Sequence, residues 1–182
     1  MKLKSAHLGN SQRFTSTAKI FHWLLAVLIP GMLSLGWYMM LIEETPAAPW
    51  YFDLHKSIGM VVAATVVLRL LWRLTHRPPM LPAHVAQWQV SASKVSHWLL
   101  YASLLAMPAL GFAGALFSED GLSFFGLPLT TFAHPNKDVS EVLFSTHGVI
   151  AWILAGLIAV HVLAALKHLL IAKDGLFHRM WF

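Results

Sequence analysis

The last long apolar stretch of the chain, residues 142–172, reads VLFSTHGVIAWILAGLIAVHVLAALKHLLIA and contains one charged residue, Lys167. A helix needs roughly 20 mostly apolar residues to cross a bilayer. This stretch therefore predicts a membrane-spanning helix, long enough to project past the bilayer on one side. It also contains three histidines, and ionisable groups inside a spanning helix are costly and usually functional.

His147 and His161 are fourteen residues apart in this stretch. On an α-helix, fourteen residues bring a side chain to within about 40° of the same face and about 21 Å further along the axis. Both histidines are thus expected to face the same way, one near each membrane surface. The separation suits two stacked planar cofactors and is far too long for a single zinc site, whose ligands converge on one ion.

Three further stretches are long and apolar enough to span a membrane, residues 21–42, 54–74 and 97–117. The connections are short, and short connections make successive helices antiparallel neighbours. We therefore expect one domain over residues 1–182, an all-α membrane protein built as an up-down bundle of four transmembrane helices. The composition agrees, because 57% of the residues are hydrophobic and 12% are charged, against about a quarter charged in soluble domains.

Lysines and arginines lie mainly on one side of the predicted spans. Eleven of the 13 fall in the N-terminal segment, around the link between the second and third spans, and at the C-terminal end, where Asp174 is the single acid. Lys56, Lys137 and the other seven acids fall on the opposite side. Cytoplasmic segments carry the excess of Lys and Arg, so both termini are expected in the cytoplasm. The basic residues form no single patch, which argues against nucleic acid as a partner.

A haem iron held by His147 or His161 needs a second axial ligand from another helix. The second span runs inward, so His55 enters at the outer side, level with His147. The first span runs outward, so His22 enters at the inner side, level with His161. Ligation by two histidines blocks both axial positions, so such haems transfer electrons rather than bind oxygen. The absence of cysteine excludes covalent c-type attachment, and the pattern predicts two haem b groups.

Other residues fall at the same two levels. Arg69 lies fourteen residues beyond His55, level with the inner pair, and a haem propionate would give it an anionic partner. The alternative is that Arg69 extends to the inner surface. Gly36 and Gly111 fall at the outer level, where a missing side chain would admit a porphyrin. Ordinary helix packing explains each glycine about as well.

The ligands of the inner haem stay open on spacing alone. The motif His97-Trp-Leu-Leu repeats His22-Trp-Leu-Leu, and both open helices that start on the inner side. Either histidine could pair with His161. His168 adds a second ambiguity, because it lies seven residues after His161, nearly on the same face and about 10 Å further in.

Taken together, these motifs resemble the bacterial cytochrome b561 family, over about residues 14 to 181. The matching segments are His22-Trp23, His55-Lys-Ser-Ile-Gly59 with Arg69 and Arg73, Ser96-His97-Trp98, Thr146-His147-Gly148, and His161 followed by His168.

The resemblance implies a four-helix, di-haem b cytochrome of the bacterial inner membrane. It implies that the iron ligands are His55 with His147 and His22 with His161. His97 and His168 would then be unligated, near the inner surface, where they could bind a quinone or relay protons to it. Family members exchange electrons with the quinone pool, and superoxide oxidation with ubiquinone as acceptor is one activity associated with them.

Superoxide is an anion, and its fast capture benefits from a basic surface. The outer segments carry net negative charge, with Lys56 and Lys137 as their basic residues, so a neutral, cationic or protein donor remains an alternative. A second hypothesis is a haem-containing membrane anchor that passes electrons for a soluble dehydrogenase or hydrogenase. A haem-free transporter is less favoured, because the histidines lie toward the surfaces rather than at the midplane. A homodimer is compatible with such a bundle.

Overall fold

The computed structural model describes residues 13–80, 82, 85–129 and 134–182. Within this part of the chain, four long helices dominate: α1 (Ser16–Leu41), α2 (Ala48–Thr75), α3 (Gln87–Phe117) and α4 (Lys137–Leu166), the last continued by the π-helical segment η2 (Lys167–Ala172). All four are long and apolar enough to cross a membrane. The expected all-α fold with four spanning helices is therefore confirmed.

Each helix begins several residues before the apolar stretch expected from the sequence. At α1, the Thr15 hydroxyl caps the first turn by accepting a hydrogen bond from the amide of Ala18 at 3.3 Å. At α4, the Asn136 side chain accepts one from the amide of Val139 at 3.2 Å. Capping residues are often polar, so a prediction based on hydropathy starts these two helices too late.

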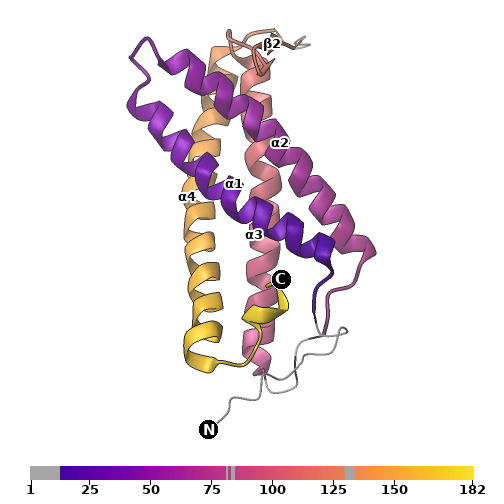
Figure 1. Cartoon of the computed structure of the whole chain (residues 1–182). Coiled ribbons are helices and arrows are strands. Elements are labelled where there is room, and N and C mark those ends of the chain that lie inside the picture. The colour runs from indigo at the N-terminus through magenta and orange to yellow at the C-terminus, as the bar shows by residue number, and fades with distance from the viewer. Residues whose placement is uncertain (1–12, 81, 83–84, 130–133) are drawn as a thin grey trace.

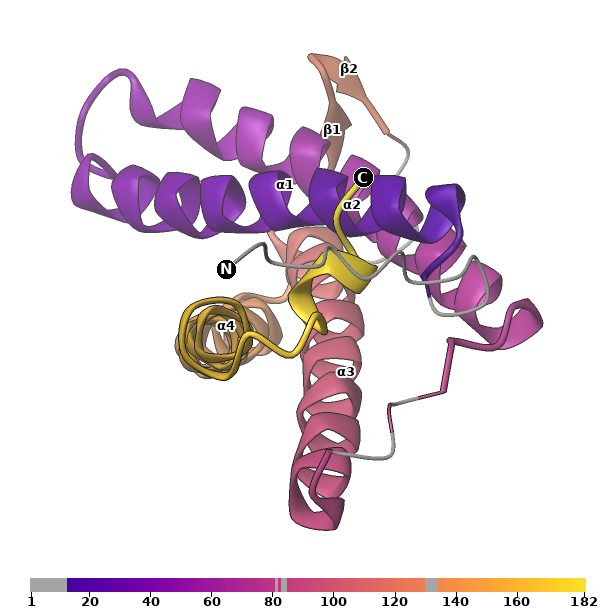
Figure 2. The ribbon, with the colours of Figure 1, turned by 60° about the horizontal axis from the view of Figure 1, so that its bottom comes forward.

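The helices pack as two pairs. Helix α3 packs chiefly against α4 and α1 against α2, while α2 and α3 join the pairs and α1 touches α4 at few points. Figure 1 shows α3 and α4 side by side, with α1 and α2 lying obliquely across them, and Figure 2 shows the same crossing from below. A buried cluster where the pairs meet joins three helices: Leu25, Ile29, Val62, Val66 and Leu154.

The two ends of the bundle differ in charge. The start of α1, the end of α2, the start of α3 and the end of α4 meet at one end, here called the basic end. The opposite end, here called the acidic end, carries a short hairpin of β1 (Ser123–Phe124) and β2 (Leu127–Pro128). The hairpin is fastened to α2, because Ser123 Oγ donates to Asp53 Oδ1 at 2.7 Å and the Phe125 amide donates to Ser57 Oγ at 2.8 Å.

The C-terminal segment folds back over the basic end. The amide of Phe14 donates to the carbonyl of Arg179 at 3.2 Å, and the indole of Trp23 donates to the carbonyl of Met180 at 2.9 Å. The guanidinium of Arg179 donates to the carbonyl of Met80 at 2.8 Å. Residues before α1, after α2 and after α4 are thus joined at one place.

Candidate functional site

At the acidic end, α2 and α4 bring two imidazoles face to edge. The ring centres of His55 and His147 lie 6.2 Å apart, with an interplanar angle of 78°. His147 Nδ1 lies 2.9 Å from the carbonyl oxygen of Met107. A carbonyl only accepts, so Nδ1 carries the proton and Nε2 is left with a lone pair. Histidines that bind metals generally show this arrangement.

Two glycines make room for these rings. A Cβ atom added to Gly111 on α3 would lie 3.1 Å from Cε1 of His147, and one added to Gly36 on α1 would lie 3.3 Å from Cε1 of His55. Both distances are tighter than ordinary van der Waals contact. The sequence left porphyrin clearance and ordinary helix packing open at these positions, and the structure shows that both glycines lie against the imidazoles.

His55 holds a buried polar atom that the protein leaves without a partner. Among the described residues, Nδ1 of His55 is the one buried side-chain nitrogen or oxygen atom that makes no hydrogen bond. Such groups are rare in folded proteins and call for an explanation. A bound ligand in contact with the His55 ring would explain why the protein itself gives this atom no partner.

At the basic end, three helices contribute imidazoles. The ring centres of His22 on α1 and His161 on α4 lie 6.2 Å apart, the same separation as in the pair at the acidic end. His97 on α3 also approaches His161, with ring centres 5.6 Å apart. The structure therefore brings together three of the four histidines that spacing left open at this level, His22, His97 and His161.

Hydrogen bonds distinguish His22 from His97. Arg69 can only donate, and its Nη2 lies 3.1 Å from His22 Nδ1, so that nitrogen accepts. His97 Nδ1 lies 2.6 Å from the carbonyl oxygen of Ser93 and donates to it. In this arrangement His97 has the hydrogen-bond pattern of a metal ligand, as His147 does. His22 does not have that pattern, because its Nδ1 accepts from Arg69.

Arg69 lies at the level predicted for it, beside the histidines of the basic end. Its guanidinium lies over the ring of Tyr101, 5.8 Å from the centre, and Arg73 lies over the same ring at 6.0 Å. His168 is held elsewhere, on the π-helical segment after α4, where its Nδ1 lies 2.6 Å from Asp174 Oδ2. Within the described residues, no ring contact joins His168 to the three histidines of the cluster.

The two sites fit haem better than a metal ion held by protein alone. In the described part of the chain, no three His, Asp or Glu side chains converge as a metal site. Two imidazoles that bind one metal from opposite sides, each at about 2 Å, have ring centres roughly 6 Å apart. The pairs at 6.2 Å match that separation, and a porphyrin supplies the remaining four nitrogens.

Comparison with known proteins agrees with this geometry. A family model described as prokaryotic cytochrome b561 matches residues 13–182. The chain belongs to the prokaryotic cytochrome b561 family. As a member of that family it is a membrane protein that binds haem b and takes part in electron transfer.

Individual relatives cover nearly the whole chain. Cytochrome b561 homolog 2 of Escherichia coli (strain K12) is 34% identical over 93% of this chain and 91% of its own length. Cytochrome b561 homolog 1 of the same organism is 30% identical over 92% and 96%. A protein named probable superoxide oxidase CybB, of Yersinia pestis, is 26% identical over 87% and 90%.

Sequence reasoning missed the part of this cytochrome b561 site built by the C-terminal segment. Trp23 adjoins His22, and it is held by the carbonyl of Met180 and by the ring of Trp181, 5.2 Å away between centres. Tryptophans near the ends of spanning helices, such as Trp23 and Trp98, are typical of the membrane interface. Only the folded chain shows that the first of these tryptophans is fastened to the opposite terminus.

Proposed function

We propose that this chain is a di-haem b cytochrome that transfers electrons across the bacterial inner membrane between a donor on the outer side and ubiquinone. The observation that supports it most is the recurrence of one geometry, an imidazole pair at 6.2 Å between ring centres, at both ends of the bundle. The acidic end faces outward and both termini are cytoplasmic in this proposal, as the distribution of Lys and Arg predicts.

In this proposal His55 and His147 hold one haem, and His22 and His161 hold the other. Haem b with two imidazole ligands supplies a one-electron redox centre with no open position for oxygen. Between the two levels, the buried side chains of Leu25, Val66 and Leu154 fill the bundle, which keeps water away from the space between the sites. Arg69, which donates to His22 Nδ1, would be the residue that pairs with a propionate of the second haem, and His22 Nδ1 would then be free to carry the proton, as in other metal-bound histidines.

His97 and His168 are assigned to quinone binding and proton relay at the basic end. The His97 ring lies beside His161, and its Nε2 keeps a lone pair because Nδ1 donates to the Ser93 carbonyl, so Nε2 can accept a hydrogen bond from the hydroxyl of a reduced quinone. His168 and Asp174 form a half-buried pair at 2.6 Å, and an imidazole bonded to a carboxylate can pass a proton along that hydrogen bond. This role for His97 requires that His22, rather than His97, is the ligand.

The outer donor follows from the charges of the acidic end. One relative is named a probable superoxide oxidase, which supports superoxide as the donor and an oxidoreductase activity for this chain. Against it, Lys56 is paired with Asp53 at 2.8 Å and Lys137 with Glu141 at 3.7 Å. Because a carboxylate neutralises each lysine, the acidic end has no positive surface patch at either residue. The electrostatic field of this end therefore favours a neutral, cationic or protein donor.

The test is to purify the full chain in detergent and measure haem per polypeptide by the pyridine haemochrome assay. Two haems per chain support the paired-ligand proposal, and superoxide and a quinol can then be compared as reductants of those haems. One haem would mean that one histidine pair is misassigned. No haem after expression with adequate haem supply would contradict the proposal. Copurification of a soluble redox subunit would favour the membrane-anchor alternative.

A further inference from the structure

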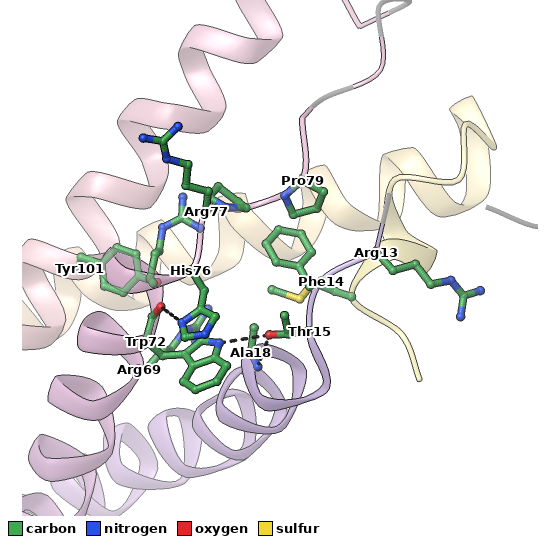
Figure 3. Close-up of a pocket in the computed structure, with 13 residues that line it drawn as sticks. Arg13, Phe14, Thr15, Ala18, Arg69, Trp72, His76, Arg77, Pro79 and Tyr101 are labelled. Carbon is green, nitrogen blue, oxygen red and sulfur yellow. Dashed lines mark hydrogen bonds between the residues drawn. The ribbon is translucent and has the colours of Figure 1, made fainter. Parts of the chain in front are cut away.

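A cavity of about 240 Å³ opens at the basic end, beside the histidine cluster but outside it. The segment before α1, the end of α2 with the residues that follow it, and α3 form its walls (Figure 3). Its polar lining is basic: Arg13, Arg69, Arg73, His76 and Arg77, with the Thr15 hydroxyl. None of the described residues that line it is acidic.

Among the described residues, no Asp or Glu side chain lies in this cavity to neutralise its arginines. All eight acids belong to the described residues, and seven of them lie toward the acidic end. The eighth, Asp174, is bonded to His168 and is not among the residues that line the cavity. Arg69 and Arg73 moreover lie over the same Tyr101 ring. Like charges this close repel where water is scarce, so an anion from outside the chain would stabilise them.

The rest of the cavity is preformed. The ring of His76 stacks on Trp72 at 3.7 Å between centres and 7° between planes, and the Trp72 indole donates to Thr15 Oγ1 at 3.1 Å. These contacts tie the end of α2 to the start of α1. Arg13 and Arg77, both exposed, extend from opposite sides of the cavity in Figure 3, so each can turn toward a group bound between them.

We propose that this cavity binds a phosphate group, contributed either by an anionic lipid headgroup of the adjoining leaflet or by free phosphate. Guanidinium groups match phosphate oxygens through paired hydrogen bonds. Basic pockets between spanning helices are typical sites for anionic lipid headgroups. A quinone is neutral and would leave the arginine charges unopposed. The inference stands on Arg13, Arg73 and Arg77, and it does not depend on the number of haems or on the propionate role given to Arg69.

The experiment uses the full, haem-loaded chain in detergent and native mass spectrometry. Phosphatidylglycerol or phosphatidylcholine is added, and the lipid retained per chain is measured. The variant R73Q/R77Q is compared with K94Q/K173N, which removes two positive charges from exposed positions outside the cavity; asparagine tolerates the left-handed conformation of residue 173. We expect R73Q/R77Q to retain phosphatidylglycerol at least about tenfold less tightly, because each arginine near an anionic headgroup contributes several-fold to binding. K94Q/K173N should bind as the unmodified chain does.

Adding inorganic phosphate distinguishes the two possible sources of the bound phosphate group, a lipid headgroup and free phosphate. Displacement of phosphatidylglycerol by millimolar phosphate supports a site for phosphate itself, and retention of the lipid supports a headgroup site. Equal retention of phosphatidylglycerol by both double variants would overturn the proposal, and so would equal retention of phosphatidylcholine by the unmodified chain. If R73Q/R77Q loses its haem spectrum, the single variants R13Q and R77Q replace it, because both side chains are exposed and lie outside the helices. Unchanged retention in both single variants would then contradict the proposal.

Discussion

The two histidine sites use the same helices in different ways. At the acidic end, α2 and α4 contribute His55 and His147, and glycines of α1 and α3 lie against those rings. At the basic end, α1, α3 and α4 all contribute histidines, and α2 contributes Arg69. The first site thus has one possible pair of imidazoles, and the second has two pairs that share His161.

This difference shows what helical spacing can decide. Helices α1 and α3 carry the same pattern, a His-Trp-Leu-Leu motif with a glycine fourteen residues after the histidine. At the acidic end, where α1 and α3 have these glycines, the imidazoles come from α2 and α4, so His55 and His147 form one unambiguous pair. At the basic end, α1 and α3 each contribute an imidazole, and helical spacing cannot choose between His22 and His97 as the partner of His161.

The largest expected effect is the loss of one haem at a time. His147→Ala should remove the haem of the acidic end, and His161→Ala the haem of the basic end, so each variant should contain half the haem of the unmodified chain. The measurement is haem per chain with the reduced spectrum, and His178→Ala, an exposed histidine outside both sites, is the control. Loss of both haems from a folded single variant would argue against two independent sites.

The choice between His22 and His97 comes next. We expect His22→Ala to lose the haem of the basic end and His97→Ala to keep it while slowing electron transfer to quinone. The reason is that His97 is assigned to the quinone rather than to the iron. Haem content and the rate of haem reoxidation by a ubiquinone analogue measure the two effects. The reverse pattern of haem loss would make His97 the ligand and remove its quinone role.

A smaller effect is expected from closing the space beside the rings of the acidic end. Gly111→Ala would place a methyl group 3.1 Å from His147, and overpacking of this kind costs about 1–3 kcal/mol. Haem at the acidic end should dissociate more readily during dilution, while haem at the basic end is unaffected. Gly148→Ala is the matched control, because nothing lies within 4 Å of a Cβ added there. Equal behaviour of the two variants would show that this contact does not limit haem binding.

The smallest effect concerns the C-terminal segment. Trp23→Phe removes the hydrogen bond to the carbonyl of Met180, worth about 1 kcal/mol. The basic-end haem should be released at a slightly lower temperature in a thermal melt followed by haem absorbance. Trp37→Phe, which disturbs the Trp37–Trp152 stack instead, should leave the basic-end haem unchanged. A shift of both haems by Trp23→Phe would indicate general destabilisation rather than a local link to His22.

Much of the fold could be predicted, because crossing a bilayer imposes a local requirement. Four apolar stretches predicted four helices, and the described residues confirm all four, although the polar caps Thr15 and Asn136 start two of them before the apolar stretches. The family was also identified from its motifs and is confirmed. The assignment of ligands, quinone residues and orientation stays a prediction.

The sequence by itself determined that His147 and His161 face one side of a single helix, one toward each end, because the period of an α-helix is a property of the chain alone. Only the tertiary structure decided that Gly36 and Gly111 abut imidazoles, that Arg69 donates to His22, and that Trp23 is held by the C-terminal segment. These contacts depend on the rotation and crossing of separate helices. That arrangement results from side-chain packing summed over the whole bundle, which no local pattern of residues contains.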